Sequence, residues 1–117
     1  MGSGIKIGVV GPCAAGKTTL VSGMAQYNLQ VRHIAQEHSY VPTMWQRITN
    51  PDLLIYLDVS YSKTMQRRAL SWSEQEYQEQ VHRLRHAREH AHLYIQTDDL
   101  TPAEVLKIVI DFITPRL

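Results

Sequence analysis

Residues 5–20, with the sequence IKIGVVGPCAAGKTTL, predict a strand, a tight loop and a helix, in that order. Residues 5–10 are apolar and rich in β-branched side chains, a pattern typical of a buried strand, and Gly11 ends the run. Beyond the loop, residues 17–28 carry apolar side chains at the spacing of one helical face. These side chains are Leu20, Val21, Met24 and Tyr27.

Within this stretch, residues 11–18 match the phosphate-binding pattern G-x-x-x-x-G-K-[ST] at every fixed position. Glycines let the backbone curl so that N–H groups point at a phosphate, and the helix start adds a positive dipole end. In such a P-loop the lysine, here Lys17, reaches the β- and γ-phosphates, and the hydroxyl of Thr18 holds Mg²⁺. The loop therefore predicts a nucleoside triphosphate with Mg²⁺, and the absence of a guanine-reading motif and the kinase resemblance described below favour ATP. The predicted phosphate-binding residues are Gly11, Cys13, Ala14, Ala15, Gly16, Lys17, Thr18 and Thr19.

The rest of the chain alternates between strand and helix patterns, which predicts parallel strands joined by crossover helices. Capping boxes at Ser73–Glu76 and Thr101–Glu104 mark the starts of two helices. The predicted elements are strands over 31–36, 53–58 and 92–96, and helices over 44–48, 62–70, 73–91 and 102–113. The expected fold is α/β, a three-layer sandwich with a parallel sheet of about four strands and the P-loop NTPase fold.

Composition and charge narrow the classes of function. The formal net charge of +1 indicates neither a nucleic-acid partner nor a membrane partner. Cys13 is the single cysteine, so no intrachain disulfide can form, and no apolar run approaches the roughly 20 residues that span a bilayer. A cytoplasmic protein is expected, with residues 1–4 as a start or cloning remnant and residues 5–117 as a single domain.

Three stretches resemble the P-loop kinases of the nucleoside and nucleotide kinase type. Residues 5–20 resemble the P-loop region of that family, and residues 52–70 (DLLIYLDVSYSKTMQRRAL) resemble a later core strand and the helix after it. Residues 94–106 (YIQTDDLTPAEVL) resemble the terminal strand, the adenine-side loop and the final helix. The resemblance implies lid arginines that clamp the phosphates. It also implies the sheet order 31–36, 5–10, 53–58, 92–96.

Two residues compete for the role of the second acid at the magnesium ion. Asp58 ends the apolar run LLIYLD, which fits the bare pattern of an aspartate after a core strand. Glu37 follows the weaker strand over 31–36, and the kinase resemblance favours it, because the family's strand that matches 53–58 is not usually the magnesium strand. Both remain candidates for binding the metal together with Thr18.

Arginines gather between residues 67 and 88, at Arg67, Arg68, Arg83, Arg85 and Arg88. Transfer of a phosphoryl group needs positive charge over the developing negative charge, which arginine supplies in bidentate fashion. On the predicted helix over 73–91, Arg88 falls within the apolar face, Arg85 lies at its edge and Arg83 points away. The predicted catalytic residues are Lys17, Arg88, Arg85 and Arg67, with Arg68 as the alternative to Arg67. A solvated helix paired with nearby glutamates is the competing interpretation.

Histidines recur every four residues on the same predicted helix, at His82, His86 and His90. This spacing puts them on one helical face, where such pairs can bind a metal. The same periodicity places them opposite the apolar face, so we expect an ordinary solvent-exposed surface.

The connection over residues 39–51 contains Tyr40, Met44 and Trp45. If they lie near the carboxyl end of the preceding strand, these side chains could line a pocket for a phosphate acceptor. The alternative, which we favour, is that Met44 and Trp45 cover the sheet as part of its core.

The sequence supports two functions. The first is a kinase that transfers the γ-phosphoryl group of ATP to a small molecule, a nucleoside or a nucleotide. The second, an alternative to this leading interpretation, is an ATP-binding or ATPase module that acts through a partner protein. Its one supporting feature is that residues 29–52 are a short interval for an acceptor-binding segment. A GTPase switch is disfavoured because neither N-K-x-D nor D-x-x-G occurs. The oligomeric state stays open.

Overall fold

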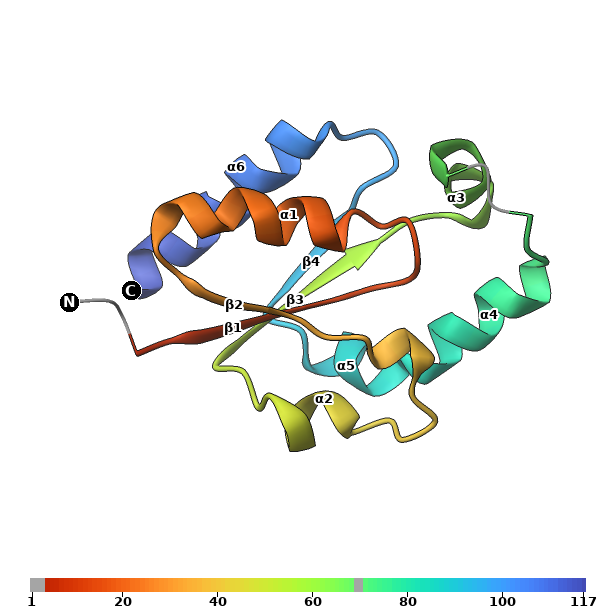
Figure 1. Ribbon diagram of the computed structural model, residues 1–117, viewed down its shortest axis with the longest axis horizontal. Helices are drawn as coiled ribbons and strands as arrows, with labels where there is room; N and C mark the ends of the chain where they lie inside the picture. Colours follow the sequence, from red (N-terminus) through yellow and green to blue (C-terminus); the bar gives the residue numbers. More distant parts are fainter. Residues whose placement is uncertain (1–3, 69–70) are drawn as a thin grey trace.

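The predicted strands form one parallel sheet in the computed structural model, which describes residues 4–68 and 71–117 (Figure 1). The strands are β1 (Lys6–Val10), β2 (Gln30–His33), β3 (Leu53–Asp58) and β4 (Leu93–Gln96). Their order across the sheet, β2-β1-β3-β4, is the order that the kinase resemblance implied. The α/β class and the four-stranded parallel sheet are therefore confirmed.

Because all four strands are parallel, their carboxyl ends lie at the same end of the sheet. β1 pairs with β2 up to Val9↔His33 and with β3 up to Val10↔Tyr56, and β3 pairs with β4 up to Asp58↔Gln96. The loops that follow these strands consequently lie together at the carboxyl end of the sheet, which is where open parallel sheets bind ligands.

Helices cover both faces of the sheet and give the molecule three layers (Figure 1). α1 and α6 pack together on one face, and α2 and α5 lie on the other, with α4 leading into α5. The described helices are α1 (Lys17–Met24), α2 (Met44–Ile48), α3 (Tyr61–Arg68), α4 (Glu74–Arg83), α5 (Arg85–His90) and α6 (Pro102–Ile113). Short 3₁₀ helices are η1 (Ala25–Tyr27), η2 (Gln36–His38) and η3 (Thr114–Arg116).

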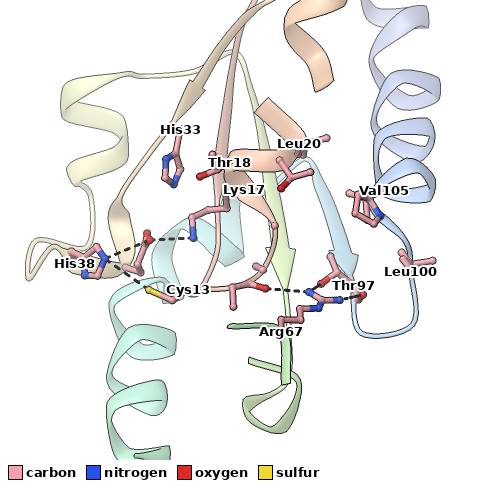
Figure 2. Close-up of a pocket in the computed structure, with 16 residues that line it drawn as sticks. Cys13, Lys17, Thr18, Leu20, His33, His38, Arg67, Thr97, Leu100 and Val105 are labelled. Carbon is pink, nitrogen blue, oxygen red and sulfur yellow. Dashed lines mark hydrogen bonds and ion pairs between the residues drawn. The ribbon is translucent and has the colours of Figure 1, made fainter. Parts of the chain in front are cut away.

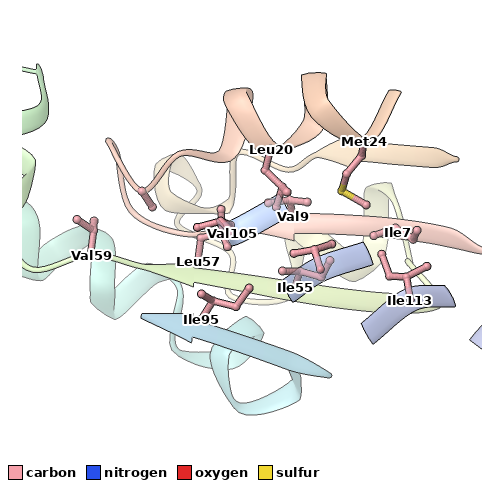
Figure 3. Packing of buried hydrophobic residues seen from close by; sticks show 12 residues of the cluster. Ile7, Val9, Leu20, Met24, Ile55, Leu57, Val59, Ile95, Val105 and Ile113 are labelled. Atoms are coloured by element: carbon pink, nitrogen blue, oxygen red, sulfur yellow. The ribbon is translucent and has the colours of Figure 1, made fainter. Parts of the chain in front are cut away.

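Alternating residues of the central strands fill two separate cores. On β3, Ile55 and Leu57 face α1 and α6, whereas Leu54 and Tyr56 face the opposite layer, and all four are at most 1% exposed (Figure 3). The first core also contains Ile7, Val9, Leu20, Met24, Val105, Val109 and Ile113. Because β3 is buried on both faces, its continuous apolar sequence could be recognised as a central strand.

Trp45 belongs to the second core, which confirms that it covers the sheet. Its side chain is 4% exposed and packs with Leu84 and Ala87. Met44 is half-buried, whereas Tyr40 is 85% exposed. Tyr40, Met44 and Trp45 are not among the residues that line the cavity described below.

The predicted helix over residues 73–91 is interrupted, which corrects its expected continuity. α4 ends at Arg83 and α5 begins at Arg85, with Leu84 between them at φ −92° and ψ −2°. Leu84 is wholly buried in the second core. Periodicity and a capping box indicate where a helix starts and which face is apolar, but they carry no information about an interruption at a residue held by tertiary packing.

The buried face of α4 and α5 is also rotated from the predicted face. Gln80, Leu84 and Ala87 are buried, whereas Arg88, which was predicted on the apolar face, is exposed. The prediction weighted large apolar side chains and therefore missed a glutamine and an alanine that occupy this face. Arg88 instead lies over the ring of Tyr94, with its guanidinium carbon 5.0 Å from the ring centroid.

The same rotation corrects the expected solvent position of His86, whereas His90 is exposed as predicted. Trp45 Nε1 donates a hydrogen bond to His86 Nδ1 over 3.1 Å, and His86 is half-buried. The rings of His86 and His90 lie 4.1 Å apart, and both contact the Trp45 ring. His82 is exposed, as predicted.

Several element boundaries differ from those predicted. β2 ends at His33, so Glu37 lies in η2 rather than at the end of a strand. The first helix ends at Met24 and continues as η1. Residues 1–3 of the predicted remnant and residues 69–70 of the predicted helix over 62–70 lie outside the described residues. Within the described part of the chain, no helix combines the length and apolar character needed to cross a bilayer.

Gly11 is required where the chain leaves β1, because its φ of +154° disfavours other residues and a Cβ atom would lie 2.1 Å from the carbonyl oxygen of Leu57. We expect Gly11→Ala to lower the free energy of unfolding by at least about 2 kcal/mol, measured by urea denaturation. Gly4→Ala, whose Cβ would meet nothing within 4 Å, should have little effect. Equal effects of the two substitutions would contradict the assigned packing.

Candidate functional site

Residues 11–16 form a compact loop that connects β1 to α1. The loop requires positive φ angles at Gly11 (154°), Ala14 (68°) and Gly16 (99°). Ala14 is the unusual member, because a residue with a Cβ atom adopts this conformation only at some cost, and such strain is concentrated at functional sites. The sequence therefore builds a sharply curved backbone immediately before a helix begins.

The start of α1 differs from the starts of α4 and α6. Those two helices satisfy their first N–H groups with complete capping boxes, at Ser73–Glu76 and Thr101–Glu104. α1 begins after Gly16, which has no side chain to act as a cap. The first N–H groups of α1 face the loop without a capping side chain, and the positive end of the helix dipole lies there. This arrangement favours an anion.

Lys17 is buried at the first position of α1, with 5% of its side chain exposed. Its Nζ atom donates hydrogen bonds to the carbonyl oxygens of Gly11 (2.6 Å) and Pro12 (2.9 Å). The ammonium group therefore lies across the loop that precedes it and is held by the backbone of that loop.

Glu37 supplies the negative charge opposite Lys17. Its Oε2 atom lies 3.1 Å from Lys17 Nζ, and 4% of its side chain is exposed. Among the described residues, Oε1 of Glu37 is a buried side-chain oxygen without a hydrogen-bond partner. Leaving such an atom unsatisfied is costly, so the structure has an acceptor available for an incoming donor or cation.

A cavity of about 740 Å³ opens beside this ion pair (Figure 2). Residues 13–19, His33, Glu37 and His38 form its polar side. The opposite side is more apolar and is lined by Leu20, Leu100, Pro102 and Val105. The volume lies within the range of roughly 300–1,000 Å³ that small-molecule sites occupy. A polar end beside an anion-favouring loop and an apolar end suit a ligand with one charged and one aromatic part.

Arg67 is the arginine that lines this cavity. Its Nη1 atom donates to the carbonyl oxygen of Ala14 (3.2 Å) and to the hydroxyl of Thr97 (2.9 Å), and Nη2 donates to the carbonyl oxygen of Thr97. Arg67 therefore connects α3, the 11–16 loop and the end of β4 (Figure 2). Of the three arginines predicted as catalytic, it is the one beside the loop.

Arg85 and Arg88 lie elsewhere. Arg85 is exposed and donates to the carbonyl oxygen of His82, and neither Arg85 nor Arg88 lines the cavity beside Lys17. Arg83 was predicted to point away from the apolar face of its helix. In the structure its Nη1 donates a hydrogen bond to the backbone carbonyl oxygen of Glu37 (3.3 Å). The side chain of Arg68 is outside the described part of the structure.

Asp58, the second candidate acid, is engaged outside the cavity. Its carboxylate accepts hydrogen bonds from the Val59 N–H (2.9 Å) and from the Tyr94 hydroxyl. Burial and this hydrogen bond to Asp58 raise the pKa of Tyr94 to about 12. The geometry therefore puts Glu37, and not Asp58, against the 11–18 loop.

Gln80 and Thr97 are among the residues of the site that were not predicted from the sequence. Gln80 is buried on α4, accepts a hydrogen bond from the Cys13 N–H (3.0 Å) and donates to Cys13 Sγ (3.2 Å). Thr97 is 1% exposed and connects Arg67 to the carbonyl oxygen of Asp58. Neither belongs to a motif, and only the fold brings them to the loop.

His33 lies at the end of β2 and lines the cavity near Lys17. Burial lowers the pKa of His33 below the ordinary value of 6.5, and the Lys17 ammonium lowers it further, whereas Glu37 raises it. His33 is therefore neutral at neutral pH and can accept or donate a hydrogen bond to a ligand.

Comparison with known proteins gave no match to a protein-family model, to a curated protein or to a solved structure. The interpretation of this site therefore depends on its own geometry and chemistry.

The buried ion pair predicts strong coupling between Lys17 and Glu37. Lys17→Met or Glu37→Gln alone leaves a buried charge unpaired, and we expect each to lower the free energy of unfolding by about 3–5 kcal/mol. Lys17→Met combined with Glu37→Gln should cost less than either single substitution. Urea denaturation of the four proteins measures this cycle. The exposed pair Lys107–Asp111 is the control, where the same cycle should show little coupling. Additive effects at Lys17 and Glu37 would contradict the pairing.

The pKa of His33 reports on the charge of Lys17. We expect an NMR titration of the folded protein to give a pKa below 6.5 for His33. Lys17→Met removes a charge that lowers this pKa, so the His33 pKa should rise. Lys107→Met, an exposed substitution on α6, should leave it unchanged. The assignment is wrong if both lysine substitutions have the same effect.

Proposed function

We propose that this chain is an ATP- and Mg²⁺-binding protein with a P-loop and the P-loop NTPase fold, and that it acts as a kinase. It would transfer the γ-phosphoryl group of ATP to a small molecule, a nucleoside or a nucleotide. One observation carries the proposal: buried Lys17 lies across a sharply curved loop that opens into a helix start without a capping side chain. Backbone N–H groups, helix dipole and ammonium group then all favour a phosphate at the same place.

The cavity supports a nucleotide rather than a free phosphate. The loop accounts for its polar end, and the side chains of Leu100, Pro102 and Val105 provide an apolar wall at the other end. A purine base has an apolar face that such a wall can cover, whereas inorganic phosphate has no group for it. This wall belongs to the segment whose sequence resembles the adenine-side loop and final helix of the nucleoside and nucleotide kinases.

Thr18 and Glu37 fit a Mg²⁺ ion that accompanies the triphosphate. Magnesium prefers oxygen ligands and keeps several of its waters. The Thr18 side chain is exposed to the cavity, and the unpartnered Oε1 of Glu37 could accept a hydrogen bond from a metal-bound water. Asp58 is engaged with Tyr94 and Val59, so we propose Glu37 as the acid on the magnesium side. When bound, Mg²⁺ would neutralise part of the charge on the phosphates.

Arg67 is the arginine that we propose to contact the phosphates. It borders the loop through the carbonyl oxygen of Ala14, and guanidinium groups have five N–H donors, so further donors remain for a ligand. Lys17 and Arg67 would stabilise the transferring phosphoryl group from two sides.

The alternative function, an ATP-binding or ATPase module that acts through a partner, has one observation in its favour. Residues 29–52, the interval that holds the acceptor-binding segment in the resembling kinases, are largely used for structure here. They form β2, η2 and α2, and Trp45 from this interval is buried in the second core.

The proposal predicts that the protein binds ATP in the presence of Mg²⁺ and binds GTP more weakly. Isothermal titration with each nucleotide measures the affinities, and mass spectrometry of the mixture detects ADP. Tight binding with little ADP favours a kinase without its acceptor or a binding module, whereas steady ADP release favours an ATPase. Failure to bind either nucleotide would refute the proposal.

Matched variants locate the binding site in the same experiment. Lys17→Met combined with Glu37→Gln removes both buried charges and should weaken ATP binding by roughly 10–100-fold, the value of a lost charge-assisted hydrogen bond. Lys107→Met is the control for loss of a lysine. Arg67→Ala should weaken binding, whereas Arg88→Ala should not, because Arg88 lies on Tyr94 away from the cavity. Unchanged affinity in the double variant would mean that ATP binds elsewhere.

A further inference from the structure

Three potential metal ligands from two separate segments converge beside the ion pair. Cys13 lies in the 11–16 loop, whereas Glu37 and His38 lie in η2. Cys13 Sγ is 4.0 Å from His38 Nε2, and His38 Nε2 is 3.8 Å from Glu37 Oε2. One ligand atom from each of the three residues lies within 4.8 Å of the others, and Figure 2 shows Cys13 and His38 pointing toward one another.

The chemistry of this set selects a transition metal. Thiolate, imidazole and carboxylate together are typical ligands of Zn²⁺, whereas Mg²⁺ prefers oxygen alone. Tetrahedral zinc, with bonds of about 2.0–2.3 Å, separates its ligand atoms by roughly 3.3–3.6 Å. One ligand atom from each residue already lies within 4.8 Å of the others, so side-chain rotations can close the set, with the Glu37 carboxylate presenting Oε1 while Oε2 stays with Lys17. We propose that Cys13, Glu37 and His38 bind a zinc ion and leave its fourth position open.

Glu37 provides an independent indication of a missing cation. Its carboxylate is almost fully buried, and Oε1 has no hydrogen-bond partner among the described residues. Lys17 occupies the other oxygen, Oε2, at 3.1 Å. A cation at Oε1 would satisfy the unpartnered oxygen without displacing Lys17, whose ammonium group also donates to two backbone carbonyls. The nearby positive charge of Lys17 reduces the affinity for any cation, so strong ligands are needed.

The surroundings of Cys13 hold its sulfur in position. Gln80 is buried, accepts a hydrogen bond from the Cys13 N–H and donates one to Sγ over 3.2 Å. Outer partners of this kind orient metal ligands. His38 is 61% exposed, so an ion can reach the site from solvent.

This site goes beyond the proposed nucleotide function and does not require it. Metal binding can be measured with no nucleotide present. If both sites exist, zinc and the Mg²⁺–ATP complex compete for Glu37, because each uses the same carboxylate.

The test uses Co²⁺ as a spectroscopic substitute for Zn²⁺, added to the reduced full-length protein without nucleotide. We expect one equivalent to bind and to produce a sulfur-to-cobalt charge-transfer band, which a stoichiometric amount of Zn²⁺ abolishes. Cys13→Ala should remove the band. His38→Ala should weaken binding by more than the roughly 10–100-fold typical of an outer-shell change. Because His38 is exposed, its replacement should leave the fold intact, which thermal denaturation checks.

His90→Ala is the matched control, because His90 is an exposed histidine outside the Cys13, Glu37 and His38 cluster, with its ring 4.1 Å from that of His86. It should leave the cobalt spectrum and the affinity unchanged. The proposal is overturned if the parent gives no charge-transfer band, or if the band survives in Cys13→Ala. It is also overturned if metal affinity depends on His90 and not on His38.

Discussion

The buried ion pair between Lys17 and Glu37 joins the two segments from which the candidate site is built. Lys17 begins α1 and Glu37 lies in η2, and the sheet does not pair these segments with each other. Only 5% of the Lys17 side chain and 4% of the Glu37 side chain are exposed, so removing either charge would leave the other buried and unpaired. A buried pair of this kind need not add net stability, because desolvation offsets its attraction. We infer that its contribution is positional, holding η2 against the loop.

Local and periodic signals were sufficient to predict the sheet. The strand over 53–58 could be recognised because it is apolar on both faces, and the capping boxes marked the starts of α4 and α6. The predicted order of the strands came from the family resemblance and agrees with the sheet. The strands and the helix starts depend on residues close together in the chain, whereas the order of the strands depended on the resemblance.

The buried residues of α4 and α5 could not be predicted from local and periodic signals in the same way. The predicted apolar face of residues 73–91 assumed one continuous helix and gave most weight to large apolar side chains. The observed buried face includes Gln80, whose polar groups are satisfied by Cys13, and Ala87, whose small side chain allows close packing. This shift explains why Arg88 was wrongly placed and why His86 contacts Trp45. Arg67 could be proposed as a lid residue by resemblance, but its contact with Ala14 depends on packing between distant segments.

Charge balance constrains how the proposed site could accept a nucleotide. In the structure, Glu37 already neutralises Lys17, so the pair offers little net positive charge to an incoming polyanion. A triphosphate therefore needs a further positive group, and Arg67 at the cavity edge supplies one. A divalent cation would supply the rest of the positive charge that a triphosphate needs, and Oε1 of Glu37 is a buried oxygen available to it. Binding a phosphate to Lys17 and a cation to Glu37 would separate the pair and leave both charges compensated. Mg²⁺ should consequently accompany the nucleotide, because a phosphate that draws Lys17 away would otherwise leave the buried carboxylate of Glu37 unpaired.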